Sequence, residues 1–289
     1  MAETQNTAAH NKNVRKHKKI KRFFLFIAII FIVWWFNNFT VKLNYNEIHS
    51  TKITSQVRIA VMSDFHAGKY NPKPEKILSK LKKSDPDIVF FLGDMYSRSS
   101  TSSEVERAVK LMSDAVKLGS PVYFVPGDHD TSDIYLDELR AAKIHVMDYK
   151  NEAINVNGNN IQIYGIDNVY FSPTFDLRNE FTLSDSYFNI LMAHIPTYDK
   201  YAEFGADLTI CGDTHGGIIQ LPFAKGPVYY NDTKQWLPEI SGKRDDVYDK
   251  GFFDYSGGTM FITSGLGNHP YPARLNNRPE IAIIDILPQ

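Results

Sequence analysis

Aspartate and histidine residues gather in five short segments of this chain, and each segment follows a hydrophobic run. Carboxylates and imidazoles are the side chains that bind divalent metal ions. Two such ions about 4 Å apart can hold a bridging hydroxide and clamp the attacking and leaving oxygens of a phosphoryl group. The sequence therefore predicts a hydrolytic centre with two metal ions. The five segments are Asp64-Phe65-His66, Gly93-Asp94, Gly127-Asp128-His129-Asp130, Ala193-His194-Ile195-Pro196 and Gly212-Asp213-Thr214-His215-Gly216-Gly217.

The elements that must position these residues alternate between strand and helix patterns in the first part of the chain. Residues 57–62, 88–92 and 122–125 are short apolar runs typical of buried strands, whereas 73–83 and 104–118 have helical spacing. This order predicts a mostly parallel sheet. Candidate ligands follow the carboxyl ends of these strands, which is where open α/β sheets place their functional sites.

The second half of the chain is richer in strand patterns, which predicts a second sheet packed on the first. Residues 220–258 interrupt the pattern, because they are rich in Gly, Pro, Tyr and charge and have little periodicity. An irregular insertion of this length commonly has a functional role. Its position beside the last candidate ligands favours a substrate lid, and a solvated surface loop is an equal alternative. The strand patterns span residues 161–166, 188–192, 208–211, 260–263 and 281–286.

The first 43 residues have the pattern of a membrane-targeting segment. Residues 1–22 contain seven Lys or Arg and one Glu, although the net charge of the whole chain is -1. Residues 23–43 begin with an apolar run that ends at Phe36, and their length is near the ~20 residues of a spanning helix. The run alone also suits a signal peptide, but no small-x-small cleavage motif follows it. We therefore predict an uncleaved, single-pass signal anchor, with a basic cytoplasmic tail at 1–22 and the body outside the cytoplasm.

The rest of the sequence limits the domain organisation and the partners of the protein's body. Residues 44–56 are polar and lack helix or strand periodicity, so they are predicted to tether the anchor to one domain at residues 57–289. Because the basic tail carries the positive charge, the body is acidic, which argues against a nucleic-acid partner. The single Cys211 excludes intrachain disulfides. No feature of the sequence sets an oligomeric state.

In order and content, the five segments resemble the calcineurin-like metallophosphoesterase family across roughly residues 57–288. The resemblance implies a four-layer α/β-β/α sandwich of two mixed sheets flanked by helices. It also implies a ligand set for two divalent ions, in which Asp94 bridges both. The first ion would take Asp64, His66, Asp94 and His215, and the second would add Asp128, His194 and Asp213.

The resemblance further implies catalytic and substrate-binding roles. His129 would contact the phosphate and protonate the leaving alkoxide, and Asp130 is a candidate to orient its ring. The segment from Ser264 to Pro270, with Arg274, resembles the closing segment of the membrane-anchored branch of the family. Asn268, His269 and Arg274 are therefore candidate substrate contacts, and a fold-stabilising ion pair is an equal alternative for Arg274.

Three positions depart from the family pattern. Asp128 stands where the family normally has Asn, Asp213 where it has His, and Ser97 where it often has Asp. Two extra carboxylates favour hard, oxygen-preferring ions, so we predict Mn²⁺ or Mg²⁺ over Zn²⁺ at the second position. For the pair of ions as a whole, Mn²⁺ is the first choice, and Mg²⁺, Zn²⁺ and Fe are the alternatives. A more negative centre also acidifies a bound water less, which predicts a higher active pH. Ser97 is expected to alter how its neighbours are oriented.

The leading functional prediction is a membrane-anchored phosphoesterase at the outer face of the membrane. The anchor and the aromatic residues of the insertion favour a lipid-linked or cell-envelope substrate. A hydrolase like UDP-2,3-diacylglucosamine pyrophosphatase ranks second, since that reaction faces the cytoplasm. A catalytically silent, metal-stabilised binding module ranks third, because His129 and Asp94 are both present. The aromatic residues are Phe223, Tyr229, Tyr230, Trp236 and Phe252.

Overall fold

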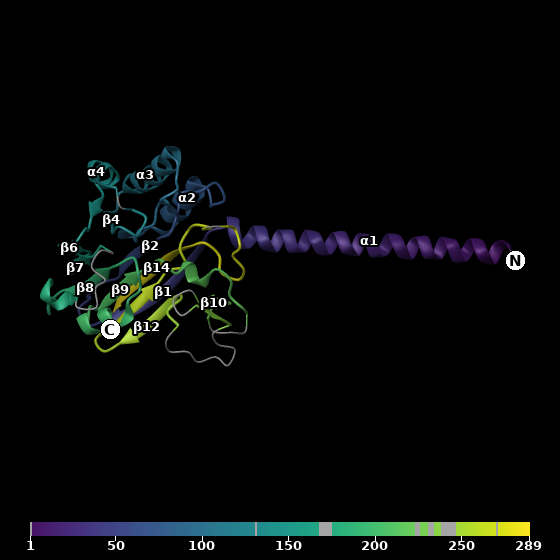
Figure 1. The fold of residues 1–289 in the computed structure, drawn as a ribbon. Helices are drawn as coiled ribbons and strands as arrows, with labels where there is room; N and C mark the ends of the chain where they lie inside the picture. Colours follow the sequence, from purple (N-terminus) through teal and green to yellow (C-terminus); the bar gives the residue numbers. More distant parts are fainter. Residues whose placement is uncertain are drawn as a thin grey trace.

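Two six-stranded mixed sheets form the body of the protein, and one long helix projects from it (Figure 1). This arrangement of two mixed sheets with helices confirms the predicted α/β class. In the first helix, side chains are described from Lys16 onward. The computed structural model describes residues 2–130, 132–167, 175–222, 226–230, 234–237, 247–269 and 271–289.

The first sheet has the strand order β1-β14-β2-β3-β4-β5. Strands β2 to β5 run parallel to one another, β14 runs antiparallel to β2, and β1 pairs parallel with β14. Strands β2, β3 and β4 are short and almost wholly apolar, as expected of strands buried on both faces. Their bounds are β1 (Lys42–Ser50), β2 (Val57–Met62), β3 (Ile88–Phe91), β4 (Val122–Phe124), β5 (His145–Val146) and β14 (Glu280–Pro288).

The second sheet has the order β12-β13-β9-β8-β7-β6. Its four middle strands are parallel, and an antiparallel strand flanks them at each edge. A separate two-stranded sheet pairs β10 with β11. The bounds are β6 (Lys150–Val156), β7 (Asn159–Gly165), β8 (Phe188–Met192), β9 (Leu208–Cys211), β10 (Tyr229–Tyr230), β11 (Gln235–Trp236), β12 (Gly251–Tyr255) and β13 (Gly258–Ile262).

Three hydrophobic clusters separate these layers. Alternate residues of β2 face opposite ways: Ala60 and Met62 pack toward the helices, whereas Ile59 and Val61 pack toward the second sheet. A third cluster covers the other face of the second sheet, where Tyr201 and Phe204 of α5 contribute. The helices are α2 (Pro74–Ser84), α3 (Ser102–Val116) and α4 (Asp133–Ala141) beside the first sheet, and α5 (Tyr198–Phe204) beside the second.

Two segments predicted to be irregular contain strands. Residues 42–50, most of them in the predicted tether, pair with β14 along the edge of the first sheet. Their polar side chains are tolerated because an edge strand leaves one side to solvent, and backbone pairing rather than an apolar pattern defines it. Residues 251–255, in the predicted lid, form the edge strand β12. The irregular part of that insertion is therefore shorter than predicted.

Helix α1 (Ala2–Phe39) is built into the body at its inner end. Asn38 is fully buried, and its side-chain amide donates to the backbone oxygen of Arg274 at 3.0 Å. In return the backbone amide of Arg274 donates to Asn38 Oδ1 at 2.8 Å. The indole of Trp34 donates to the backbone oxygen of Pro272 at 2.7 Å. The helix thus ends at Phe39 as part of the fold, before the predicted end of the anchor at residue 43.

Candidate metal centre

Seven predicted ligands converge where the carboxyl ends of strands from both sheets meet. Strands β2, β3 and β4 of the first sheet precede ligands, as do β8 and β9 of the second. Within each of four groups of three residues, one ligand atom per side chain lies within 4.8 Å of the others. These groups are Asp64, His66 and His215; His66, Asp94 and His129; Asp64, Asp94 and His194; and Asp128, His194 and Asp213.

Sharp turns after the strands aim these side chains at one another. Five of the seven residues have positive φ angles, between 49° and 69°. Residues with a Cβ seldom adopt this conformation, which costs of order 1–3 kcal/mol each and is concentrated at functional sites. Local strain at the ligands is therefore held by the surrounding fold. The five residues are Asp64, His66, Asp94, Asp213 and His215.

One of these groups, which we call the first half of the candidate metal centre, consists of Asp64, His66 and His215. The Nε2 atoms of the two imidazoles are 3.1 Å apart. Burial lowers the pKa of His66 to about 3, and burial also holds the pKa of His215 well below its ordinary value. Both rings are therefore neutral, which is the form that binds metal. Nδ1 of His66 is 2.9 Å from Oγ of Ser97, so this serine fixes the ring.

Asp64 is fully buried beside these two rings. Its two carboxylate oxygens accept the backbone amide of Asp213 at 3.1 and 3.2 Å. Burial raises the pKa of Asp64 to about 7. A buried carboxylate of this kind calls for a cation next to it.

The second half of the metal centre consists of Asp128, His194 and Asp213. His194 is fully buried, and its Nδ1 lies 2.6 Å from the backbone oxygen of Leu92, which fixes the proton on that nitrogen. Its Nε2 has no hydrogen-bond partner among the described residues. That atom lies 3.7 Å from Asp213 Oδ1 and 3.8 Å from Asp128 Oδ1. An orphaned imidazole nitrogen that faces carboxylates fits a metal position.

The charge around His194 supports the same interpretation. Burial alone would lower the pKa of this ring, but the nearby carboxylate of Asp94 raises it well above its ordinary value, with help from Asp64 and Asp213. The carboxylates therefore demand a positive charge at Nε2. A metal ion bound there would take the place of that proton.

Asp94 lies between the two halves. Its Oδ2 is 3.4 Å from Nε2 of His194 and 3.7 Å from Nε2 of His66. Burial would raise the pKa of Asp94, but the nearby imidazole of His194 keeps it below its usual range. Space beside this carboxylate is tight, since a Cβ at Gly127 would lie 2.2 Å from Asp94 Oδ1. Only glycine lets that loop approach so closely.

His129 stands at the mouth of the centre, and its support differs from the prediction. The backbone amide of Arg98, rather than Asp130, donates to Nδ1 of His129 at 2.9 Å. With Nδ1 as acceptor, the ring proton lies on Nε2, which is 3.8 Å from Asp94 Oδ2. Asp130 is buried instead and accepts the backbone amides of Gly127, at 3.0 Å, and of Asp94. Its role is to join two ligand loops.

The three predicted substrate contacts have different outcomes. Arg274 is buried and donates to the backbone oxygens of Gly267 at 2.7 Å and His215 at 3.3 Å, so it braces loops rather than facing a substrate. The side-chain amide of Asn268 likewise donates to a backbone oxygen, that of Asn38, at 2.7 Å. His269 does reach the centre, because its ring stacks on His66 with 4.2 Å between centroids.

Sequence reasoning missed Arg98 as a residue of the site. Its guanidinium donates to the backbone oxygen of Asp128 at 2.7 Å and lies 3.6 Å from the Oδ2 of the same residue. With 67% of its side chain exposed, it is the type of residue that a sequence alone assigns to the surface. Its position four residues after Asp94 is the signal that could have found it.

The second half of the metal centre opens into an aromatic pocket of about 760 Å³. Asp213, His215 and His269 line one side of it. The predicted lid contributes part of the wall, although Phe223 lies outside the described residues. Phe252 differs from the prediction because it packs between the sheets, against Phe261. The aromatic lining residues are Tyr198, Tyr229, Tyr230, Trp236 and Tyr248.

The chain is similar to proteins of known sequence and structure. A family model described as calcineurin-like phosphoesterase matches residues 57–217, more than half of the chain. The chain is 25% identical over 240 residues to the uncharacterized metallophosphoesterase YkuE of Bacillus subtilis (strain 168), covering 79% of this chain and 78% of that protein. It is 24% identical to an uncharacterized metallophosphoesterase of Aquifex aeolicus (strain VF5), covering 91% of this chain and 98% of that one. Among solved structures, TT1561 of Thermus thermophilus is similar with a TM-score of 0.44 and 13% identity, covering 55% of this chain and 82% of that one.

Proposed function

The chain belongs to the calcineurin-like phosphoesterase family, and from this premise we propose which residues carry out its metal-dependent hydrolysis of phosphoesters. Members of the family typically bind two metal ions. We assign Asp64, His66 and His215 to the first ion, Asp128, His194 and Asp213 to the second, and Asp94 to both. The observation that carries this assignment is the buried Nε2 of His194, which faces carboxylates without a hydrogen-bond partner among the described residues.

The protein's own residues then divide the work around the phosphoryl group. Bound ions supply Lewis acidity and a water molecule of lowered pKa. His129 presents Nε2–H at the mouth of the centre and is positioned to donate to the leaving oxygen. Arg98, whose guanidinium donates to the backbone oxygen of Asp128, is positioned to contact the phosphate oxygens as well. His269, stacked on His66, closes the same side of the site.

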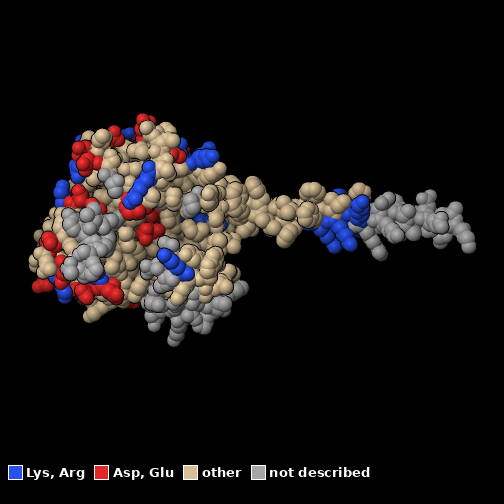
Figure 2. Space-filling view, viewed as in Figure 1, with Lys and Arg blue, Asp and Glu red and all other residues tan. Residues whose placement is uncertain are grey.

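We propose that α1 is a retained membrane anchor. Residues Lys16–Phe39 form a helix long and apolar enough to cross a membrane by length and composition. Figure 2 shows basic side chains gathered on its outer part, followed by a section without charge that reaches the body. Cleavage after the apolar run would have to cut near Asn38, which is fully buried in the fold. The basic end would stay in the cytoplasm and leave the catalytic body outside.

The substrate that suits this arrangement is a lipid-linked or cell-envelope phosphoester. The metal centre opens into a pocket walled by aromatic side chains, of which Trp236 is 73% exposed and available to an apolar group. An anchor that holds the body at the bilayer keeps such substrates within reach. A pyrophosphate-linked nucleotide lipid, as cleaved by UDP-2,3-diacylglucosamine pyrophosphatase, is the second substrate class, and it requires the opposite topology.

Mn²⁺ is the metal that we propose for the second position. Its ligand set would include three carboxylates, from Asp94, Asp128 and Asp213, and a single imidazole. Oxygen-rich sets of this kind suit Mn²⁺ and Mg²⁺ better than Zn²⁺. The same excess of negative charge favours activity at higher pH, because a less positive centre acidifies a bound water less.

The test is hydrolysis by the full chain in detergent, because both α1 and β1 are part of the fold. Bis-p-nitrophenyl phosphate, p-nitrophenyl phosphate and a nucleotide pyrophosphate are assayed with Mn²⁺, Mg²⁺ or Zn²⁺. Asp94→Asn should lose activity, whereas Asp114→Asn, on the surface of α3, should keep it. Two metal ions bound without turnover on any of these substrates would instead support a silent binding module.

A further inference from the structure

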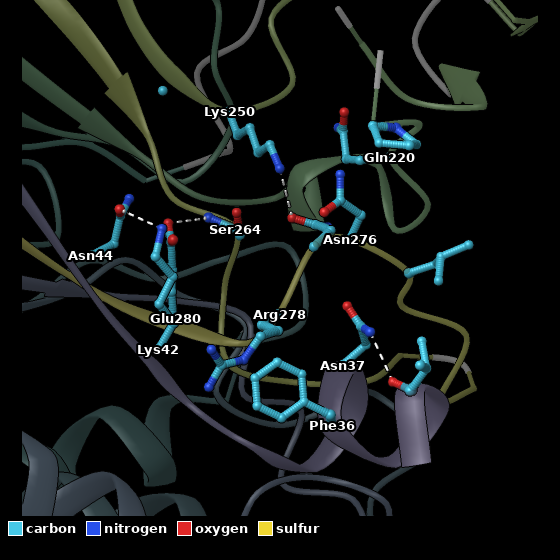
Figure 3. A pocket seen from close by; sticks show the side chains of 15 residues that line it. Phe36, Asn37, Lys42, Asn44, Gln220, Lys250, Ser264, Asn276, Arg278 and Glu280 are labelled. Atoms are coloured by element: carbon cyan, nitrogen blue, oxygen red, sulfur yellow. Dashed lines mark hydrogen bonds between the residues drawn. The ribbon is translucent and has the colours of Figure 1, made fainter. Parts of the chain in front are cut away.

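A second pocket, of about 710 Å³, lies where α1 joins the body. The helix forms one wall through Val33 and Phe36, and Lys250 reaches in from the opposite side (Figure 3). This pocket is distinct from that of the metal centre. Asp249 lines the metal-centre pocket and its neighbour Lys250 lines this one, so one segment of chain separates them.

Three basic side chains line this junction pocket, and their hydrogen-bond partners are neutral. Within the described part of the chain, none of the three forms an ion pair. Lys42 Nζ donates to Asn44 Oδ1 at 2.7 Å, Lys250 Nζ to Asn277 Oδ1 at 3.2 Å, and Arg278 Nε to Thr40 Oγ1 at 3.0 Å.

Positive charge exceeds negative charge in the junction pocket. Glu280 is the one carboxylate among its described lining residues, and its Oε1 already accepts the backbone amide of Ser264 at 3.0 Å. Burial lowers the pKa of Lys250. The carboxylates of Asp249 and Glu280 oppose this effect, and the charge of Lys42 adds to it. An anion placed among these groups would offset the burial and the repulsion between the basic side chains.

The wall formed by α1 is apolar and faces outward. Val33 is 43% exposed and Phe36 45% exposed. The guanidinium of Arg278 lies 4.1 Å from the centre of the Phe36 ring, so the basic and apolar parts of the pocket meet there. From this point the helix surface stays apolar toward its outer, basic end. If α1 crosses a membrane, the junction pocket opens at the level of the lipid headgroups.

We propose that the junction pocket binds the phosphate headgroup of an anionic glycerophospholipid, with the acyl chains lying along α1 at Val33 and Phe36. The inference rests on the proposed membrane anchor and does not depend on hydrolysis. Charge complementarity selects the class of lipid, because three basic side chains match a headgroup with net negative charge. A zwitterionic headgroup would bring a cation of its own into an already positive pocket.

The test counts lipids bound to the full chain by native mass spectrometry in a non-ionic detergent. The probes are phosphatidylglycerol, phosphatidylcholine and inorganic phosphate. We expect one phosphatidylglycerol per chain, bound at least tenfold more tightly than phosphatidylcholine. Lys42→Gln combined with Lys250→Gln should weaken that binding roughly 25-fold, since each basic residue near a headgroup contributes about fivefold. Lys76→Gln, which removes an exposed charge from α2, is the matched control and should change nothing.

Several outcomes would overturn the proposal. Equal binding of both lipids, or unchanged binding to a double variant that still unfolds cooperatively, would remove the role of the basic side chains. Displacement of phosphatidylglycerol by millimolar inorganic phosphate would assign the pocket to free phosphate. Lys42→Gln alone, at an exposed residue, should give about fivefold weaker binding and replaces the double variant if that one fails to fold. Asp94→Asn should bind lipid normally, so lipid binding and hydrolysis can fail separately.

Discussion

The two halves of the metal centre differ in how the protein holds their side chains. In the first half, Asp64 and His66 are buried, and Ser97 fixes the imidazole of His66. In the second half, His194 is buried and held by a backbone oxygen, but the side chains of Asp128 and Asp213 are 43% and 42% exposed. The first half is therefore positioned before any ion binds, whereas the second contributes charge with less fixed geometry. Both carboxylates that depart from the family pattern lie in this more exposed half.

The largest expected effect comes from the residue that belongs to both halves. Asp94→Asn should lower kcat/KM roughly a thousandfold, because the loss of a bridging carboxylate removes several kcal/mol of transition-state stabilisation. Steady-state kinetics and metal content by plasma mass spectrometry check this. If the variant kept two ions and most of its activity, Asp94 would not connect the halves. Gly127→Ala should give a similar loss, since its Cβ would press on the Asp94 carboxylate.

Substituting one carboxylate from each half tests the comparison directly. Asp64→Asn should lose one bound ion and about a hundredfold in activity, since it disrupts a buried, prepositioned ligand. Asp128→Asn should cost less than about tenfold, because an amide oxygen at an exposed position can still bind a metal ion. Metal content and kcat/KM are measured for both variants. Equal losses from both would show that exposure does not distinguish the halves.

Much of this centre could be predicted from local sequence, because each ligand follows an apolar strand and parallel strands bring their carboxyl ends together. The residues that hold the ligand loops in place could not be predicted in this way. Arg274 lies far along the chain from His215 and Asn38, and only the fold reveals that its guanidinium and backbone bind there. For the same reason the sequence predicts a tether at residues 44–56, where most of the edge strand at 42–50 lies. Its pairing with β14 depends on residues almost at the other end of the chain.

Ser97→Ala should weaken metal binding in the first half alone, because Ser97 contacts the imidazole of His66. A hydrogen-bonding partner of a metal-binding imidazole typically contributes 10- to 100-fold to metal affinity, so we expect a loss of about that size at one of two sites. Isothermal titration of the metal-free protein with Mn²⁺ measures both sites. Ser102→Ala, at the exposed start of α3, is the control. Weaker binding at both sites would mean that Ser97 acts on the whole loop.

Asp213→His should act on the second half in a different way, by changing which ion it prefers. Replacing a carboxylate with imidazole restores the family's usual residue, removes a negative charge and adds a softer ligand. We expect the ratio of activity with Zn²⁺ to activity with Mn²⁺ to rise by about tenfold. The pH optimum should also move downward, because a more positive centre acidifies a bound water more. If the metal preference did not change, the charge of the second half would not determine which ion it prefers.

The smallest expected effect comes from an ion pair away from the metal centre. It distinguishes acid sensitivity of the fold from acid sensitivity of the metal ligands. Arg58 and Asp285 form a two-bonded ion pair at 2.7 and 2.9 Å, near the start of β2 and away from the metal ligands that follow its end. The hydrogen bond from Arg58 lowers the pKa of Asp285. Stabilisation from this pair is therefore complete above the unfolded pKa of about 4 and is lost as pH falls through the lower folded pKa.

Asp285→Asn should accordingly lower the free energy of unfolding by about 0.5–1 kcal/mol at pH 7 and by less at pH 3, as measured by urea denaturation. Glu106→Gln, an exposed carboxylate of α3, should show no such dependence. The metal-loaded and metal-free chains should lose this increment equally, because the pair does not touch the centre. Any further loss of metal or activity in acid then belongs to the ligands themselves. A larger effect of Asp285→Asn in the metal-loaded chain would instead couple this end of the first sheet to the metal centre.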